Sequence, residues 1–154
     1  MPVWEWLNRQ KQAKKSAGQS ESPAFQQGSD KPGGIQNDKR TSRQQTGDDG
    51  EQRALQHLQQ AGLVLVERNF LCKGGELDLV MQDRGSLVFV EVRSRASSQF
   101  GGALASVTPA KQRRMVVAAQ VFLQRYSRVP ACRFDLICIQ DGELEWLQDV
   151  ITGP

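Results

Sequence analysis

Residues 75–93 read GELDLVMQDRGSLVFVEVR, and this stretch decides the fold because it contains two strand-like runs in succession. The runs are GELDLVMQD (75–83) and SLVFVEVR (86–93), both rich in Val, Leu or Phe, and an Asp-Arg-Gly turn signal joins them. The second run shows almost no polar alternation, which is typical of a central strand that helices cover on both faces. We therefore expect a strand pair whose second member lies inside a sheet.

A helix and a further strand are predicted before this pair. The segment TGDDGEQRALQHLQQAGL (46–63) has apolar residues at helical spacing, with Thr46 or Asp48 as the N-cap and Gly62 as the C-terminal stop. The run LVLVERNF (63–70) follows and has the composition of a strand.

A second helix and two more strands are predicted after the pair. VTPAKQRRMVVAAQVFLQRY has Thr108 as a cap and Pro109 at its first helical position, and RFDLICIQ (133–140) and ELEWLQDV (143–150) resemble strands. A strand, a long helix and another strand imply a right-handed crossover that joins parallel strands. The order αβββαβ, with a short final strand, therefore predicts an α/β fold with a mixed central sheet flanked by helices.

The N-terminal part, residues 1–46, differs in composition from the rest. Residues 18–46 contain no Leu, Val or Met, so we expect a disordered linker that cannot bury enough apolar surface to offset its ordering entropy. Trp4, Trp6 and Leu7 lie among basic residues; a loosely ordered tail is expected there, and a short amphipathic helix touching a partner or a membrane surface is the alternative. The folded domain is predicted over residues 47–150.

Charge follows the same division of the chain. Residues 1–46 hold eight Lys or Arg against four Asp or Glu, a net +4, whereas residues 47–154 hold twelve against thirteen, a net −1, which together give +3. A basic domain would be an electrostatic footprint for nucleic acid. The near-neutral domain lacks that footprint, which argues against tight DNA binding.

Several classes of protein are excluded by what the sequence lacks. No apolar stretch approaches the ~20 residues of a membrane helix, and the N-terminus does not resemble a secretory signal. Three cysteines without CxxC spacing predict free thiols in a reducing cytoplasm. His57 is the only histidine and is expected at the surface, which removes histidine-based nucleophiles and zinc sites from consideration. No GxxxxGK[ST] phosphate loop is present.

Charged residues are predicted to point inward from the two central strands. Because residues two apart share a face of a strand, Glu76 and Asp78 lie together, with Leu77, Leu79 and Met81 on the other face. On the next strand Glu91 and Arg93 share the face of Leu87 and Phe89. A buried charge needs a partner. Glu91 is therefore expected to pair with Arg93 or with a metal ion shared with Asp78.

The helices add a third acid and a cation. Glu51 lies four residues before Leu55, and Lys111 four residues before Met115, so both fall on the inward stripes of their helices. Hard divalent ions favour carboxylates, waters and phosphate oxygens. The alternatives are a structural ion pair between Glu91 and Arg93, a first-turn placement of Glu51 favoured by the helix dipole, and a solvated basic patch of Lys111, Arg113 and Arg114.

Three further residues or pairs are expected to serve the structure rather than the chemistry. Asp135 is interpreted as an inter-strand partner for a neighbouring basic residue, and Phe134 and Trp146 as core residues. Gly101 and Gly102 are expected to shape a loop near the site.

Four segments, GGELDLV, LVFVEVRSR, FGGALASVTPAKQRR and CRFDLICI, together resemble the YraN family of small bacterial proteins. That family resembles the Holliday-junction resolvases of the PD-(D/E)XK superfamily, which implies a restriction-endonuclease-like core. In the superfamily an acid of the first helix, an aspartate of the second strand and an E-x-K pair of the third form a metal site. These positions fall on Glu51, Asp78, Glu91 and Arg93.

Arg93 stands where the superfamily has lysine. Arginine stays charged in proteins, so Arg93 could stabilise negative charge but could not deprotonate a water molecule. This departure affects the expectation of catalysis more than that of fold or metal binding.

Two functions of different classes follow. The first is a metal-dependent endonuclease or resolvase-like enzyme that binds Mg²⁺ or Mn²⁺ through Glu51, Asp78 and Glu91. In this enzyme Lys111, Arg113 and Arg114 contact the phosphates of DNA. A homodimer is expected by analogy with resolvases. The second is a catalytically silent module that binds nucleic acid or a protein partner, suggested by the near-neutral domain and Arg93. A third possibility is that the tail recruits a partner and the domain is a scaffold.

Overall fold

A computed structural model describes residues 3–16, 42–95 and 107–152 of the chain. The loop expected to be shaped by Gly101 and Gly102 lies outside the described residues, as do residues 18–41 of the linker expected over residues 18–46. That expectation is wrong for residues 42–46, which are helical. The elements, in chain order, are α1 (Val3–Ser16), α2 (Ser42–Gln60), β1 (Val64–Cys72), β2 (Gly75–Asp83), β3 (Ser86–Arg95), α3 (Pro109–Leu123), β4 (Cys132–Gln140) and β5 (Glu143–Leu147).

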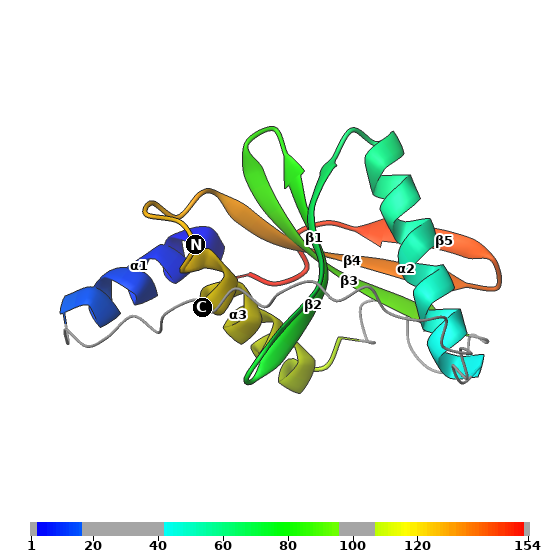
Figure 1. Cartoon of the computed structure of the whole chain (residues 1–154), viewed down its shortest axis with the longest axis horizontal. Helices are drawn as coiled ribbons and strands as arrows, with labels where there is room; N and C mark the ends of the chain where they lie inside the picture. The colour runs from blue at the N-terminus through cyan, green and yellow to red at the C-terminus, as the bar shows by residue number, and fades with distance from the viewer. Residues whose placement is uncertain (1–2, 17–41, 96–106, 153–154) are drawn as a thin grey trace, which may run out of the picture.

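The strands form one mixed sheet in the order β1-β2-β3-β4-β5 (Figure 1). Strands β3 and β4 pair in parallel, with Phe89 opposite Phe134, and every other neighbouring pair is antiparallel. Helix α3 connects the two parallel strands. The predicted mixed α/β fold with an αβββαβ core is confirmed.

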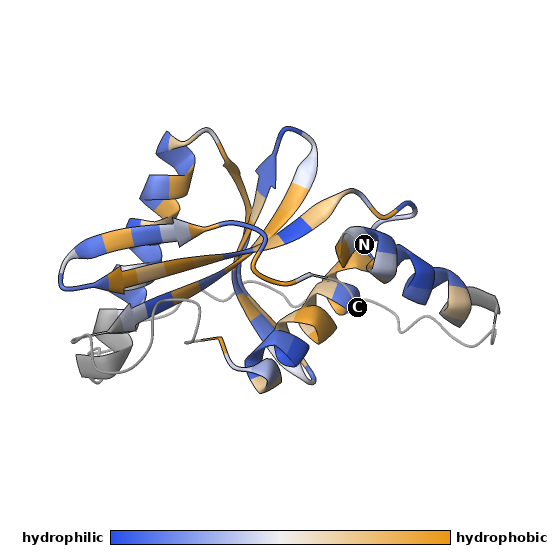
Figure 2. Cartoon of the chain, turned by 180° about the vertical axis from the view of Figure 1, so that it is seen from behind, coloured by the Kyte–Doolittle hydropathy of each residue, from blue (hydrophilic) through white to orange (hydrophobic). Residues whose placement is uncertain are grey.

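The two faces of the sheet are covered by different helices, and each face has its own apolar core. Helix α3 packs over one face, where the buried rings of Phe70, Phe89, Phe122 and Phe134 meet. Helix α2 packs over the other face through Ala54, Leu55 and Leu58. The inner strands are largely hydrophobic, whereas the helices carry hydrophilic residues on their outer surfaces (Figure 2). Strand β3 is therefore buried on both sides, as its sequence predicts.

The ends of the helices follow the predicted signals in part. Thr108 Oγ1 accepts a hydrogen bond from the Lys111 backbone N–H, with Pro109 at the first helical position, so the predicted start of α3 is confirmed. Gly62 follows α2 with a φ of 92°, which suits a C-terminal stop. The predicted N-caps of α2 are wrong, because the helix begins at Ser42 and both Thr46 and Asp48 lie inside it.

The expectation of a loosely ordered tail is wrong for residues 3–16, which form α1. Val3 and Leu7, four residues apart, are each only 2% exposed and join the core on the α3 side. Figure 1 shows α1 beside α3. An isolated helix of this length is marginal in water, but packing against the domain stabilises it, and composition does not reveal that packing.

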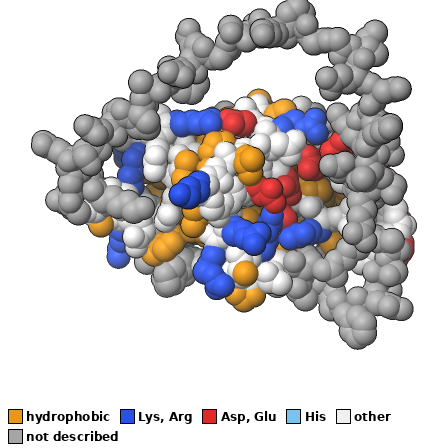
Figure 3. Space-filling view, turned by 60° about the horizontal axis from the view of Figure 1, so that its bottom comes forward, with side chains coloured by type: hydrophobic (Ala, Val, Ile, Leu, Met, Phe, Trp, Pro, Cys, Tyr) orange, Lys and Arg blue, Asp and Glu red, His pale blue; other side chains and the backbone are white. Residues whose placement is uncertain are grey.

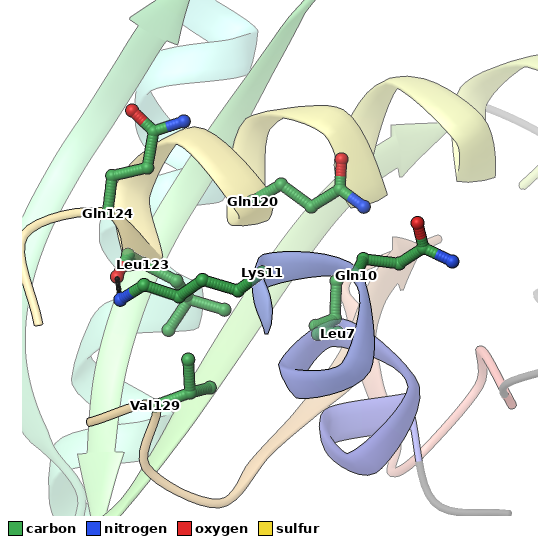
Figure 4. Close-up of a pocket in the computed structure, with 7 residues that line it drawn as sticks. All are labelled: Leu7, Gln10, Lys11, Gln120, Leu123, Gln124 and Val129. Atoms are coloured by element: carbon green, nitrogen blue, oxygen red, sulfur yellow. Dashed lines mark hydrogen bonds between the residues drawn. The ribbon is translucent and has the colours of Figure 1, made fainter. Parts of the chain in front are cut away.

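Lys11 links α1 to the C-terminal end of α3 through hydrogen bonds. Its ammonium donates to the backbone oxygen of Leu123 at 3.2 Å (Figure 4) and also to that of Tyr126. The last carbonyls of a helix have no partner within the helix, so a cation there both satisfies them and complements the helix dipole. Beside this contact, α1 and α3 enclose a cavity of about 230 Å³ lined by Leu7, Gln120 and Val129 among others.

We expect Lys11→Met to lower the free energy of unfolding by about 1 kcal/mol, because two backbone acceptors lose a charged donor. Urea denaturation followed by circular dichroism measures the change. Arg9→Met, at an exposed position of the same helix, is the matched control and should leave the midpoint within error of the wild type. Equal effects of the two substitutions would contradict a specific role for Lys11.

In the middle of strands β1 and β2, side chains two residues apart lie on opposite faces of the sheet. Phe70 lies on the α3 side, with its ring 5.3 Å from that of Phe122, whereas Arg68 lies on the α2 side and donates to Gln52 at 3.1 Å. In a regular strand these two residues would share a face. Between them Asn69 has a φ of 51°, in the left-handed region.

Strand β2 changes face at the matching point. Leu77, opposite Phe70, belongs to the α3-side core, and Leu79, opposite Arg68, belongs to the α2-side core. The predicted common face of Leu77 and Leu79 is therefore wrong. The reason is the irregular backbone opposite Asp78, which strict alternation cannot anticipate.

The described helices include none that is both long enough and apolar enough to span a membrane.

Candidate functional site

Asp78 lies where β2 and β3 separate. The ladder between these strands ends at the pair Leu79 and Val90, and beyond it Asp78 Oδ2 accepts a hydrogen bond of 2.8 Å from the Val92 backbone N–H. The carboxylate thus takes the place of a backbone acceptor between the two strands. This hydrogen bond fixes the half-buried side chain at the junction of the sheet with both helix layers.

Glu91 is the most buried acid of the site, at 2% exposure. Its Oε1 lies 3.1 Å from Arg93 Nε, and its Oε2 lies 3.2 Å from Lys111 Nζ without an aligned hydrogen bond. Burial, together with the neighbouring charge of Asp78, raises the pKa of Glu91 to about 7 despite these two cations. The negative charge of Glu91 is therefore only partly compensated.

Lys111 projects into the site from the first turn of α3. Its side chain is 11% exposed, and its ammonium lies 3.1 Å from Glu76 Oε1 as well as near Glu91. Burial alone would lower the pKa of Lys111, but Glu91, Glu76 and Asp78 raise it above its ordinary value. Of the two interpretations of Lys111, an inward cation and a solvated basic patch, the inward position is the one observed.

Glu51 approaches from α2, on the other side of Asp78. It is half-buried, its Oε2 lies 3.9 Å from Arg68 Nη2, and that oxygen accepts no hydrogen bond. Burial and the charge of Asp78 raise the pKa of Glu51, while a hydrogen bond from the Asn69 side chain and the charge of Arg68 act in the opposite direction. The charge of Asp78 thus contributes to the raised pKa of both Glu51 and Glu91.

The remaining predicted residues lie around this cluster. Arg93 forms the ion pair with Glu91 that was predicted as the structural alternative, and its side chain is 37% exposed. Arg113 and Arg114 are exposed on α3. Figure 3 shows the molecule with the lower end of Figure 1 brought forward. On this face acidic side chains are bordered by Lys and Arg side chains.

Three contributors to the site escaped the sequence interpretation. Glu76 was placed on the same face as Asp78 but was given no role, and it is the second partner of Lys111. The Val92 backbone N–H and Asn69 were not considered at all. An asparagine within a strand-like run is the one signal available, because asparagine adopts left-handed conformations more readily than most residues.

Asp135 has a structural role, as predicted, but its basic partner Arg133 lies on the same strand, β4, rather than on a neighbouring strand. Asp135 is fully buried and accepts hydrogen bonds from Arg133 Nε at 3.1 Å, from Trp146 Nε1 at 3.0 Å and from the Asp149 backbone N–H at 3.0 Å. Burial raises the pKa of Asp135, and these donors oppose that rise. Phe134 is buried in the core as predicted, Trp146 is half-buried, and His57 is exposed.

The residues present fit a divalent cation in charge and in donor atoms. Two buried carboxylate oxygens, Glu51 Oε2 and Glu91 Oε2, accept no hydrogen bond, and both acids have a raised pKa. Hard oxygen donors of this kind suit Mg²⁺ or Mn²⁺. Within residues 3–16, 42–95 and 107–152, no three Asp, Glu, His or Cys side chains are grouped closely enough to hold a metal ion. Lys111 and Arg93 occupy the surroundings of Glu91 instead.

The fold and these acids define a small restriction-endonuclease-like α/β domain with an acidic cluster where its central strands separate. Comparison with known sequences is more specific: the profile described as "Uncharacterised protein family UPF0102" matches residues 50–139. This chain belongs to that family, which is the YraN family that its sequence resembles.

Bacterial relatives agree with this assignment. A UPF0102 protein of Herminiimonas arsenicoxydans is 62% identical over 114 residues, which cover 74% of this chain and 92% of the relative. A UPF0102 protein of Janthinobacterium sp. (strain Marseille) is 58% identical over 74% of this chain and 93% of the relative. One of Alkalilimnicola ehrlichii is 49% identical over 71% and 89%. The matched segment 50–139 contains Glu51, Asp78, Glu91 and Lys111, but not α1.

Proposed function

We propose that this protein is a metal-dependent endonuclease that hydrolyses phosphodiester bonds of nucleic acid, with DNA as the preferred substrate. The observation that carries the proposal is the position of Asp78, fixed by the Val92 N–H between two acids whose charge is incompletely compensated. Two carboxyl groups with raised pKa values on either side of Asp78, with a half-buried lysine nearby, support a site for a cation and a phosphate, although no three such acids of the described residues are grouped closely enough to hold a metal ion in this conformation. A cytoplasmic homodimer is part of this proposal.

Asp78, Glu91 and Glu51 would hold Mg²⁺ or Mn²⁺. When bound, such an ion supplies charge stabilisation and an activated water molecule to phosphodiester hydrolysis. A metal ion near Glu91 would add to the positive charges of Arg93 and Lys111 and would weaken the contact of Glu91 with Lys111, whose ammonium has Glu76 as its other partner. Lys111 is therefore the group best placed to contact the substrate phosphate.

Arg93 and Lys111 together would take the roles that a single lysine has in the E-x-K pattern. Arg93 keeps its charge at any relevant pH and stabilises negative charge on the phosphate. Lys111 reaches the same carboxylate from α3 at 3.2 Å and supplies the ammonium that position 93 lacks. The departure at Arg93 thus does not leave the site without a lysine. Arg113 and Arg114 would contact the flanking phosphates.

A silent binding module is the second candidate, and one observation favours it. Arg93 and Lys111 already flank Glu91, so this acid could serve a structural ion pair without any metal ion. Such a module would bind nucleic acid with a marked salt dependence that survives the loss of the acids, because counterion release depends on the basic residues.

Calorimetric titration of Mn²⁺ tests the proposal, because metal binding must precede hydrolysis and contaminating nucleases cannot imitate it. We expect heat of binding with the wild type and none with the double variant Asp78→Asn/Glu91→Gln. The matched control is Asp141→Asn/Glu143→Gln, which removes two exposed acids at the β4–β5 turn and should bind as the wild type does.

The titration is repeated with a DNA duplex present, since phosphate oxygens can complete a metal shell. Absence of Mn²⁺ binding in the wild type under both conditions, or equal binding in the site variant, would refute the endonuclease proposal. Where binding is found, a cleavage assay with Asp78→Ala follows. Equal trace cleavage by wild type and variant would identify a contaminant.

A further inference from the structure

Asn69 adopts a conformation that is uncommon for its place in the chain. It lies within strand β1, yet its φ of 51° is in the left-handed region that L-residues seldom occupy. The other non-glycine residues with such a φ are Arg84, Asp141 and Asp149 among the described residues, and none of them lies inside a strand. Left-handed backbone of this kind costs free energy and persists only where the surroundings require it.

The position of Asn69 explains what the conformation achieves. In the register of β1 and β2, Arg68 faces Leu79 and Phe70 faces Leu77, so the residue directly opposite Asn69 is Asp78. Both strands change face across this pair. Asp78 therefore sits where β2 turns over, and its side chain is directed toward β3, where it reaches the Val92 N–H.

Regular backbone at Asn69 would remove this geometry. With uninterrupted alternation, Phe70 would share the α2-side face of Arg68 and would lose its contact with Phe122. Asp78 would then stand on one face of the sheet rather than between the strands.

We propose that Asn69 is a positioning residue of the candidate site: its left-handed backbone directs Asp78 between the strands, where Asp78 accepts from the Val92 N–H. The inference rests on the proposed function for its relevance to metal binding. The arrangement itself is a property of the metal-free protein and is tested there.

Two substitutions separate the backbone conformation of Asn69 from its side chain. Asn69→Gly keeps access to the left-handed backbone but removes the amide, whereas Asn69→Ala removes the amide and also disfavours that backbone. Arg84→Gly and Arg84→Ala, at an exposed turn residue with a φ of 48°, are the matched controls for left-handed backbone away from the site.

Nuclear magnetic resonance of the metal-free protein gives the first readouts. We expect Asn69→Gly to retain the wild-type chemical shift of the Val92 amide, because glycine adopts the left-handed backbone without penalty. Asn69→Ala should displace the Val92 amide resonance. The Arg84 variants should leave this resonance unchanged.

If Asn69→Ala fails to fold, Asn69→Gly and Asn69→Asp remain as tests, because both residues keep access to the left-handed backbone. Both variants should reproduce the wild-type Val92 amide. The proposal is overturned if Asn69→Gly and Asn69→Asp both displace the Val92 amide, or if a folded Asn69→Ala leaves it unchanged.

Mn²⁺ titration adds a readout that depends on the proposed function. Where the wild type binds Mn²⁺, Asn69→Ala should weaken binding about tenfold, the lower end of effects seen when a group that orients a metal ligand is replaced. Undiminished affinity would contradict the positioning role. If the wild type binds no Mn²⁺, the endonuclease proposal fails, while the resonance experiments still decide the role of Asn69.

Discussion

Replacing Gly75 by alanine is expected to lower the free energy of unfolding by about 3 kcal/mol, at the upper end of the usual cost of overpacking a core. A Cβ atom at this position would lie 2.1 Å from the backbone oxygen of Arg114 and 2.9 Å from its carbonyl carbon. Backbone atoms of a helix cannot rotate aside as a side chain can. The β1–β2 turn and α3 must therefore move apart, and the core between them loosens.

Urea and thermal denaturation followed by circular dichroism measure this effect, which corresponds to a fall of about 10 °C in Tm for a chain of this size. Gly47→Ala is a control of opposite sign. Gly47 lies in α2 with no atom within 4 Å of an added Cβ, so alanine there should raise stability by up to about 1 kcal/mol. A wild-type midpoint for Gly75→Ala would mean that the turn does not pack against α3.

The same contact links stability to the candidate site. Gly75 precedes Glu76, whose carboxylate holds Lys111 of α3, so the close approach of the turn and the helix sets the distance between these two side chains. A hollow lined by Leu71, Gly75 and Arg114 among others lies beside the pair. We therefore expect Gly75→Ala to weaken any phosphate contact made by Lys111, in addition to destabilising the fold.

Local sequence patterns predicted most of this architecture because they report local chemistry. Apolar runs predicted the strands, Thr108 and Pro109 predicted the start of α3, and helical spacing placed Glu51 and Lys111 on inward faces. These features depend on residues within one turn or one strand. Their physical causes are therefore readable without knowledge of the tertiary contacts.

The features that sequence did not reveal depend on distant contacts. Helix α1 is stabilised by packing against α3 across more than 100 residues of chain, as the bond from Lys11 to Leu123 illustrates. The turnover at Asn69 depends on which faces of β1 the two helices cover. Glu76 acquires its partner only when α3 docks beside the β1–β2 turn. In each case the signal lies in the docking of elements rather than in any single element.

The free energy of unfolding is expected to fall by about 3 kcal/mol as the pH rises from about 4.5 to 7, because of Glu91. Its pKa is about 7 in the folded protein against an ordinary value of 4.5, so the folded state binds this proton more tightly than the unfolded state does. The stabilisation is fully present below pH 4.5 and is lost as the pH passes through 7. The raised pKa values of Glu51 and Asp135 act in the same direction.

Denaturation midpoints measured in urea between pH 4.5 and pH 8 give this slope. Glu91→Gln should flatten it and should be more stable than the wild type at pH 8, where a neutral side chain replaces a buried and incompletely compensated charge. Glu143→Gln, at an exposed position of β5, is the matched control and should retain the wild-type slope.

The direction of this slope distinguishes the two interpretations of Glu91. In a well-compensated ion pair with Arg93 and Lys111, Glu91 would be more stable charged than neutral, and Glu91→Gln would lower stability at pH 8. An incompletely compensated acid gives the reverse result, and Mn²⁺ should then raise the midpoint of the wild type at pH 8 but not that of Glu91→Gln. A metal-dependent site is expected to lose stability at a buried acid and to recover it when a cation binds. A Glu91→Gln variant less stable than the wild type would instead show that the role of Glu91 is the ion pair.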